Sequence, residues 1–340
     1  MTGRLLSLTR TQILAFRRSV QALDERLPPG ADSLRVAAWA GLQDSMPRAA
    51  LLSIHARVER VEPSTWEDPS LVQVWGPRFS AYVVAERDRA AFTLGRLPEG
   101  GKSLQVAEEM AASLHAFLGG RRMTYGEAGD GLGVHPNRLR YAAPAGTVLM
   151  RWDGARQPTI WTAPVPKVAP REARLELARR YLHVFGPTTG AAFTKWAGIG
   201  PREGNAAFEA LGESITSVRT PIGDRWIQAS DEPTFRAPAA STSAVRLLPS
   251  GDTFFLLHGA DRELVVPDAT RRPLLWTSRV WPGAVLIGGE IIGTWRRAEG
   301  DITIGPWRRL TRTERDALEA EAESLPLPGL QGLIRMNLDD

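Results

Sequence analysis

The sequence predicts an α+β fold, and two observations lead to this prediction. Three helical segments followed by two β-rich runs occur twice in succession, over residues 101–166 and 167–236. The last third of the chain instead contains short β runs separated by glycines. Three short helices and a β-hairpin make the winged form of the helix-turn-helix. We therefore expect tandem winged-helix units packed around a small antiparallel β-rich domain.

Residues 1–100 are expected to form a first, divergent unit. Thr9 and Gln12 make a capping-box signal for its opening helix. The remaining predicted elements are helices over about 33–42 and about 47–61, a strand over 78–86, and a helix opened by Asp88.

The second unit, residues 101–166, begins with an amphipathic helix over 103–118. Thr124 is the expected N-cap of a short helix, and Pro136 opens a third. Two apolar, β-rich runs around Asp153-Gly154 predict the hairpin, or wing.

The third unit, residues 167–236, repeats this order. Its first helix should end at Gly186, and the second should begin at Thr188 or Thr189. A third helix is expected in "PREGNAAFEALG", and two strands should flank a turn at Gly223-Asp224.

Residues 237–325 are expected to form the β-rich domain, and residues 326–340 a C-terminal tail. Thr311 and Glu314 make a capping-box signal for a closing helix. The predicted strands are "TFFLLHG" (253–259), "AVLIGG" (284–289), "EIIGTWRR" (290–297) and "DITIGPWRRL" (301–310).

Composition places the chain among globular proteins. It has 340 residues, of which 43% are hydrophobic. No run of about 18 uninterrupted apolar residues occurs and no signal core opens the chain, so we expect no membrane partner and no export signal. Cysteine is absent, which excludes disulfides and thiolate metal sites, and the five histidines lack metal-ligand spacing. We therefore expect no metal.

Arginine supplies almost all of the positive charge. The net charge is +4, and all but three of the 42 basic residues are arginines. The planar guanidinium group suits phosphates and base edges, so this composition permits a nucleic-acid partner. Arginines that merely replace lysines on solvated faces would give the same composition.

Winged helices most often bind duplex DNA through the third helix and the wing. A purely structural or protein-docking unit is the alternative. The candidate DNA contacts in the second unit are His135, Asn137, Arg138 and Arg140 on the third helix, and Arg151 and Arg156 on the wing.

Three stretches of the chain resemble the AlkZ/YcaQ-type winged-helix DNA glycosylase family. They are "WAGLQDSMPRAALLSIHARV" (39–58), "RYLHVFGPTTGAAFTKWAGI" (180–199) and "RLLPSGDTFFLLHG…PGAVLIGGEIIGTWRR" (246–297). The resemblance runs in order from about Leu8 to Leu325. It implies tandem winged helices that grip double-stranded DNA and excise bulky alkylated purines, in some cases interstrand crosslinks, without metal or cofactor.

The family's catalytic motif is Gln-x-Gln in one branch and Gln-x-Asp in the other. The corresponding position here is Gln43-Asp44-Ser45, where Gln43 matches and Ser45 departs from the motif. An N7-alkylated purine is already positively charged and leaves readily, so a neutral amide holding a water can suffice for hydrolysis. Either Asp44 compensates for Ser45 by turning inward, or the substrate differs.

Ordinary helix capping is the alternative interpretation of this motif. Ser45 is a good N-cap, Pro47 suits the first turn of a helix, and the helix dipole favours Asp44. Capping accounts for Asp44 and Ser45 without catalysis, but it does not account for Gln43.

Two functional hypotheses follow. The first is a monofunctional DNA glycosylase in which Gln43 positions the water, and the second is a non-catalytic DNA-binding protein that kept the scaffold. In either case we expect a monomer without cofactor, located in the cytoplasm and associated with the nucleoid. Further candidate contacts with DNA are Arg48 and Arg78, which could touch phosphates, and Arg296 and Arg297, which could support the DNA channel.

Overall fold

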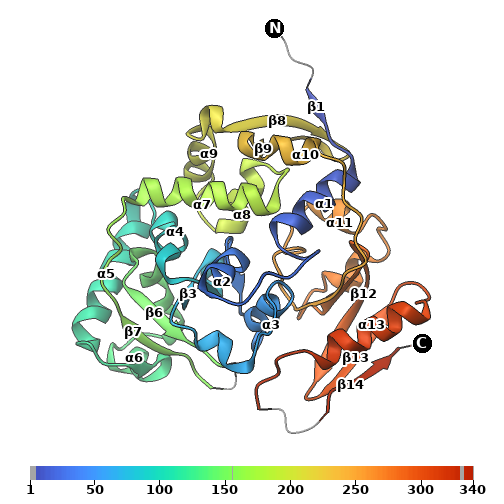
Figure 1. The fold of residues 1–340 in the computed structure, drawn as a ribbon. Helices are drawn as coiled ribbons and strands as arrows, with labels where there is room; N and C mark the ends of the chain where they lie inside the picture. Colours follow the sequence, from blue (N-terminus) through green and yellow to red (C-terminus); the bar gives the residue numbers. More distant parts are fainter. Residues whose placement is uncertain (1–4, 155, 330–332, 340) are drawn as a thin grey trace.

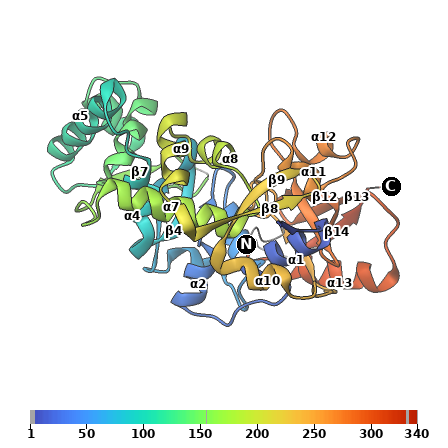
Figure 2. The ribbon, with the colours of Figure 1, turned by 90° about the horizontal axis from the view of Figure 1, so that it is seen from above.

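A computed structural model describes residues 5–154, 156–329 and 333–339. It shows an α+β fold, as predicted. Helices α5 (Gly101–Leu118) and α6 (Tyr125–Gly131) lie at one end of the molecule, and the β-rich region with helix α13 (Arg312–Glu323) lies at the other (Figures 1 and 2). Helices α2 (Ala31–Ala37) and α3 (Ala49–His55) lie between these ends (Figure 1).

A six-stranded antiparallel sheet joins the first two expected units. Its order is β2 (Leu42–Gln43), β4 (Ala81–Ala85), β3 (Leu71–Trp75), β6 (Val148–Arg151), β7 (Thr159–Thr162) and β5 (Met123–Thr124). The link between the units is the pairing of β3 with β6 at Gln73 and Met150. The hairpin predicted at Asp153-Gly154 is therefore part of a sheet that crosses the expected boundary at residue 100.

The first unit departs most from the predicted elements. Helix α1 (Arg10–Val20) begins with the predicted capping box of Thr9 and Gln12. Helix α2 ends earlier than predicted, and Leu42 pairs with β4 instead of ending a helix. Helix α3 is also shorter than predicted, since it begins after the left-handed Arg48 and ends at His55. Strand β3 was not predicted, and the helix opened by Asp88, α4 (Arg89–Phe92), is a single turn.

The second and third units contain the predicted order of elements. Thr124 caps α6, and the segment opened by Pro136 is a 3₁₀ helix, η5 (Pro136–Ala145). In the third unit, α7 (Pro170–Phe185) is followed by α8 (Gly190–Ala197), which Thr189 caps. Helix α9 (Pro201–Glu209) and the strands β8 (Ile215–Thr220) and β9 (Gly223–Gln228) complete it.

The turn between β8 and β9 lies two residues earlier than predicted. Gly223 pairs with Thr220 and belongs to β9, so Pro221 and Ile222 form the turn. Strand β1 (Leu6–Ser7) pairs with β8 in parallel, which ties the start of the described chain to the third unit.

The β-rich region is a five-stranded sheet in the order β10 (Val245–Leu248), β11 (Gly283–Ile287), β12 (Glu290–Ala298), β13 (Asp301–Pro306) and β14 (Arg335–Leu338). Only the β13–β14 pair is parallel. Helix α13 begins at the predicted capping box of Thr311 and Glu314 and packs Leu318 and Ala322 into the core of this sheet.

The prediction of a strand over residues 253–259 is wrong. The amides of Phe255 and Leu256 donate to the carbonyl of Asp252, so the chain turns there, and it buries its apolar side chains without pairing in a sheet. Phe254 and Phe255 join the main core cluster together with Phe185 of α7 and Phe193 of α8. The run is apolar because it is the connection between β10 and α11 (Asp261–Val265), which is buried against α7 and α8 of the third unit.

The remaining short elements connect these parts. They are η1 (Pro63–Glu67), η2 (Pro77–Phe79), η3 (Glu86–Asp88), η4 (Leu94–Arg96), η6 (Gly212–Ser214), η7 (Ala229–Asp231), α10 (Glu232–Arg236), α11 (Asp261–Val265) and α12 (Arg272–Leu275). In the part of the chain that the structure describes, no helix combines the length and apolar character that crossing a bilayer requires.

Candidate active site

Gln43 lies on β2, the outermost strand of the six-stranded sheet, opposite Tyr82 of β4. Its side chain is half-buried, and its Nε2 donates a hydrogen bond to Ser45 Oγ at 3.1 Å. Its Oε1 is buried and accepts no hydrogen bond from the described residues. The backbone of Gly251 lies against this amide, since a Cβ built on Gly251 would be 3.4 Å from Gln43 Oε1. The site therefore holds an anchored amide with a free acceptor.

Asp44 points into the protein and is only 2% exposed. Its Oδ1 accepts the amide of Ala50 at 3.0 Å, and its Oδ2 accepts Nε2 of Gln73 at 2.5 Å. Burial raises the pKa of the Asp44 carboxyl to about 6, although these hydrogen bonds oppose the shift. Both oxygens are engaged within the protein, so Asp44 fixes the loop that presents Gln43.

The prediction that Ser45 caps the following helix is wrong, because Asp44 accepts the amide at the start of α3 instead. Helix α3 begins after Arg48, which has a left-handed backbone (φ 64°) and makes no side-chain cap. The amide of Ala50, in the first turn, donates to Asp44 instead. Ser45 is exposed, which leaves its hydroxyl group available to Gln43.

Gln73 joins this loop to the wing of the second unit. Its Oε1 accepts the amide of Trp152 at 2.6 Å, and its Nε2 is 3.2 Å from the Trp152 carbonyl oxygen as well as bonded to Asp44. At the tip of the wing, a Cβ on Gly154 would come within 2.4 Å of Pro47. Glycine therefore allows the wing to pack directly on the loop.

Two of the candidate arginines meet on one tryptophan beside the loop. The guanidinium carbon of Arg48 lies 3.4 Å from the ring centroid of Trp66, and that of Arg151 lies 3.7 Å from it. Arg151 also approaches Glu67 at 3.4 Å. Burial lowers the pKa of Arg48, while the charge of Asp44 raises it. Stacking on the indole orients both cations without neutralising them.

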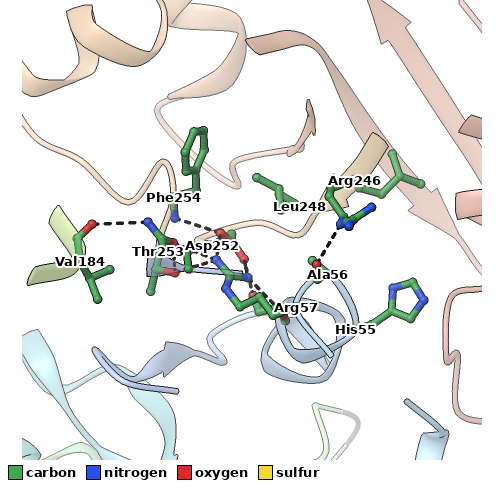
Figure 3. A network of polar contacts seen from close by, with 12 residues as sticks. His55, Ala56, Arg57, Val184, Arg246, Leu248, Asp252, Thr253 and Phe254 are labelled. Atoms are coloured by element: carbon green, nitrogen blue, oxygen red, sulfur yellow. Dashed lines mark hydrogen bonds and ion pairs between the residues drawn. The ribbon is translucent and has the colours of Figure 1, made fainter. Parts of the chain in front are cut away.

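A buried network fixes the other side of the site. Arg57, which follows α3, donates to both carboxylate oxygens of Asp252, at 2.7 and 2.8 Å, and to Thr253 Oγ1 at 2.9 Å (Figure 3). Ser53 also donates to Asp252 at 2.7 Å. Because Asp252 adjoins Gly251, this network holds the Gly251 backbone against Gln43.

The other candidate contacts are spread over the molecule. His135 Nδ1 accepts the amide of Asn137 at 3.2 Å, and Tyr125 donates to Asn137 Oδ1 at 2.8 Å, so these two residues shape the start of η5. Arg138 is exposed, and Arg140 is half-buried. The amide of Arg156 donates to Asp153 at 3.1 Å in the wing.

The last three candidate DNA contacts are Arg296 and Arg297 in the β-rich region and Arg78 in η2, which packs against Gly198 of the third unit. Arg296 and Arg297 are exposed on β12, and each makes a long contact with a carbonyl oxygen, at 3.4 and 3.3 Å. Arg78 contacts His258 at 3.2 Å. Gln73, Trp66 and Gly251 follow no local motif in the sequence, because each reaches the site through sheet pairing or long-range packing.

The donor set of the site consists of amides, a hydroxyl group and one occupied carboxylate. Among residues 5–154, 156–329 and 333–339, no group of three or more His, Asp or Glu side chains could hold a metal ion. The chemistry that these donors can perform is the orientation of a water molecule by hydrogen bonding.

Residues 36–326 match the family described as DNA glycosylase AlkZ-like, so the chain belongs to this family, and DNA is the partner that membership implies. The family resemblance inferred from the sequence is confirmed. The chain is similar to an interstrand DNA cross-link repair glycosylase from Streptomyces sahachiroi, with 21% identity over 358 aligned positions that cover 92% of this chain and 94% of the relative. It also shares its fold with the solved structure of Streptomyces sahachiroi DNA glycosylase AlkZ, at a TM-score of 0.78 and 17% identity, covering 98% of this chain and all of that one.

Proposed function

We propose that this protein is a monofunctional DNA glycosylase that hydrolyses the N-glycosidic bond of alkylated or crosslinked purines, with Gln43 positioning the water. The observation that carries the proposal is the state of the Gln43 amide. Its nitrogen is anchored by Ser45 and its oxygen has no partner among the described residues. A water donating to this oxygen would present a lone pair to the sugar carbon.

The departure of Ser45 from the family motif is compatible with this chemistry. Ser45 is too short to take the water itself, but its hydroxyl group holds Gln43 in place. We propose that Gln43 contacts the water, that Ser45 positions Gln43, and that Asp44 fixes the loop from inside. A cationic purine is a good leaving group, so one amide contact suffices for the attack.

Hydrolysis suits the chain better than a lyase reaction through an amine. The three lysines are Lys102 in α5, Lys167 before α7 and Lys195 in α8, and none belongs to the loop that carries Gln43. Crosslinked purines are proposed as substrates because the relative from Streptomyces sahachiroi is named for interstrand crosslink repair. We propose that one chain acts alone, because it supplies the second-unit wing, the Gln43 loop and the Gly251 segment itself.

The experiment is an excision assay on duplexes that carry N7-alkylguanine adducts of increasing bulk and an N7-linked interstrand crosslink. Wild-type protein should release the adduct, and Gln43→Ala should abolish release while keeping its affinity for duplex DNA. The matched control is Gln105→Ala, which removes an exposed glutamine of α5. If wild-type protein binds these duplexes but leaves all of them intact, the catalytic proposal fails. The non-catalytic DNA-binding alternative, which the departed Ser45 favours, then stands.

A further inference from the structure

Arg78 lies in a strained segment that the proposed reaction does not use. Arg78 and Phe79 in η2 both have left-handed backbones, with φ of 54° and 57°. This conformation is costly for residues other than glycine and persists only where the surroundings enforce it. Gly198 supplies part of that enforcement, since a Cβ there would lie 2.9 Å from the Arg78 nitrogen.

Contacts of the Phe79 ring also hold this backbone conformation in place. The ring packs edge-on against Tyr141 with centroids 5.2 Å apart, and the guanidinium of Arg96 lies 4.9 Å from its centroid. With Phe79 held in this way, the exposed Arg78 side chain is directed at His258, and its Nη1 lies 3.2 Å from His258 Nε2. Arg78 must donate in this contact, so His258 is neutral with its proton on Nδ1.

Two more cationic side chains lie close enough to His258 to affect its charge. Burial, and then the charges of Arg78, of Lys195, which is exposed on α8, and of Arg262 of α11, lower the pKa of His258 to about 4. Arg262 is fixed in place, because its Nε donates to the Leu257 carbonyl at 2.8 Å and its guanidinium lies 4.8 Å from the ring centroid of Trp276.

These cations lack acidic partners. Within the described ranges, Arg78, Lys195 and Arg262 form no ion pair. The two carboxylates that flank Arg262 are engaged elsewhere, since Asp261 approaches Arg225 at 3.7 Å and Glu263 approaches Arg272 at 3.4 Å. Like charges that converge without a counterion repel one another, and a bound anion removes that cost.

We propose that Arg78, Lys195, His258 and Arg262 form a binding site for a phosphodiester group of the DNA backbone. This inference rests on the proposed function for the identity of the ligand. The exposed Arg78 and Lys195 and the half-buried Arg262 would contact the phosphate oxygens, and His258 would gain a proton on binding. We call these four residues the phosphate cluster.

The phosphate cluster lies within reach of the duplex that Gln43 would contact. Arg78 is four residues from Tyr82, a stretch of at most about 14 Å when extended. Tyr82 faces Gln43 across an antiparallel pair, which adds about 5 Å. Phosphates recur every ~3.4 Å along one strand, so a separation of up to about 20 Å is less than one turn of duplex.

The experiment measures affinity for an undamaged duplex over a range of salt concentrations. Each phosphate contact contributes about 0.9 to the slope of log affinity against log salt. Because the three cations would share one phosphate, Lys195→Gln and Arg262→Gln should each reduce the slope, by at most about that amount, and Arg78→Gln should do the same if it folds. The matched control is Arg315→Gln, an exposed arginine of α13 outside the phosphate cluster, which should keep the wild-type slope.

Lys195 keeps the test decisive if other variants unfold, because its side chain is exposed and makes no described hydrogen bond. Wild-type slopes in both Lys195→Gln and Lys195→Glu would overturn the inference. Titration with inorganic phosphate alone separates the sources of the anion. If the variants lose phosphate binding but keep the wild-type slope for DNA, the site binds a small anion and the inference is wrong. This experiment measures binding to undamaged DNA. If the wild-type protein fails to excise any adduct, the proposed function fails, but the phosphate cluster is still tested independently.

Discussion

The backbone of Gly251 lies against the side-chain amide of Gln43, in a conformation that favours glycine. Gly251 has a φ of 76°, in the left-handed region, and a Cβ there would be 3.4 Å from both Cδ and Oε1 of Gln43. The space beside the unpartnered oxygen is therefore bounded by main chain that comes from a distant part of the sequence.

Gly251→Ala should lower excision at least tenfold while leaving duplex affinity unchanged, because the new methyl group occupies the space where the water would sit. The control is Gly259→Ala, which carries a similar backbone cost (φ 58°) but has open space around its Cβ. Single-turnover excision by the two variants, compared at equal folded fraction, checks this. Equal rates in both variants would show that backbone strain is the only effect.

Ser45→Ala should lower the rate of excision about fivefold to tenfold, because a lost hydrogen bond to Gln43 is worth about 1 kcal/mol. Ser45→Thr keeps the hydroxyl group and should restore most of the rate. The Michaelis constant should change little, since Ser45 acts on the position of Gln43. A Ser45→Ala variant with full activity would mean that the amide is held by something else.

Asp44 should make stability depend on pH between about 4 and about 6. Burial raises its pKa from 3.8 to about 6, so the folded protein holds the proton more tightly than the unfolded chain. Its contribution to stability is therefore fully present below pH 4 and is lost as the pH rises through 6, by on the order of 3 kcal/mol.

Chemical unfolding of wild type and Asp44→Asn across this range measures the effect. The variant lacks the titrating group, so the difference in unfolding free energy, wild type minus variant, should fall as the pH rises. Asp32→Asn, at a solvent-screened position 93% exposed in its side chain, is the control and should keep the wild-type profile. A constant difference between wild type and Asp44→Asn would contradict the raised pKa.

Asp252→Ala should destabilise the protein by about 3–5 kcal/mol, because it leaves the Arg57 guanidinium buried without a counterion. Urea unfolding measures this loss. Asp32→Ala breaks the exposed pair with Arg87 and should cost less than about 1 kcal/mol. Replacing Arg57 and Asp252 together with apolar residues should recover much of the loss, and a loss that persists in the double variant would assign it to the other bonds of Asp252.

Local signals in the sequence were reliable guides to this fold. The capping boxes at Thr9 and Thr311 and the N-cap at Thr124 each open a helix as predicted, because such caps depend on side chains and amides about three residues apart. Gln43 was expected after a helix and lies on a strand, because its pairing with Tyr82 depends on contacts far along the chain.

The environment of the site depends on long-range contacts that no local pattern encodes. The run 253–257 is apolar enough to suggest a strand, yet the buried pair of Asp252 and Arg57 sets it as a turn. Likewise, nothing in the sequence relates Lys195 or Arg262 to Arg78 before the chain is folded. Family resemblance points to Gln43, whereas only the folded chain brings Gly251 against its amide and Gln73 against Asp44.

Strand β2 is an edge strand, so it is paired on one side only, and it spans only Leu42 and Gln43. An edge strand this short offers too few free backbone groups for another protein chain to add a strand, which protects the molecule from self-association. It also leaves the flank of Gln43 uncovered by any neighbouring strand. The same brevity that guards against aggregation thus leaves the flank of Gln43 to the main chain of Gly251.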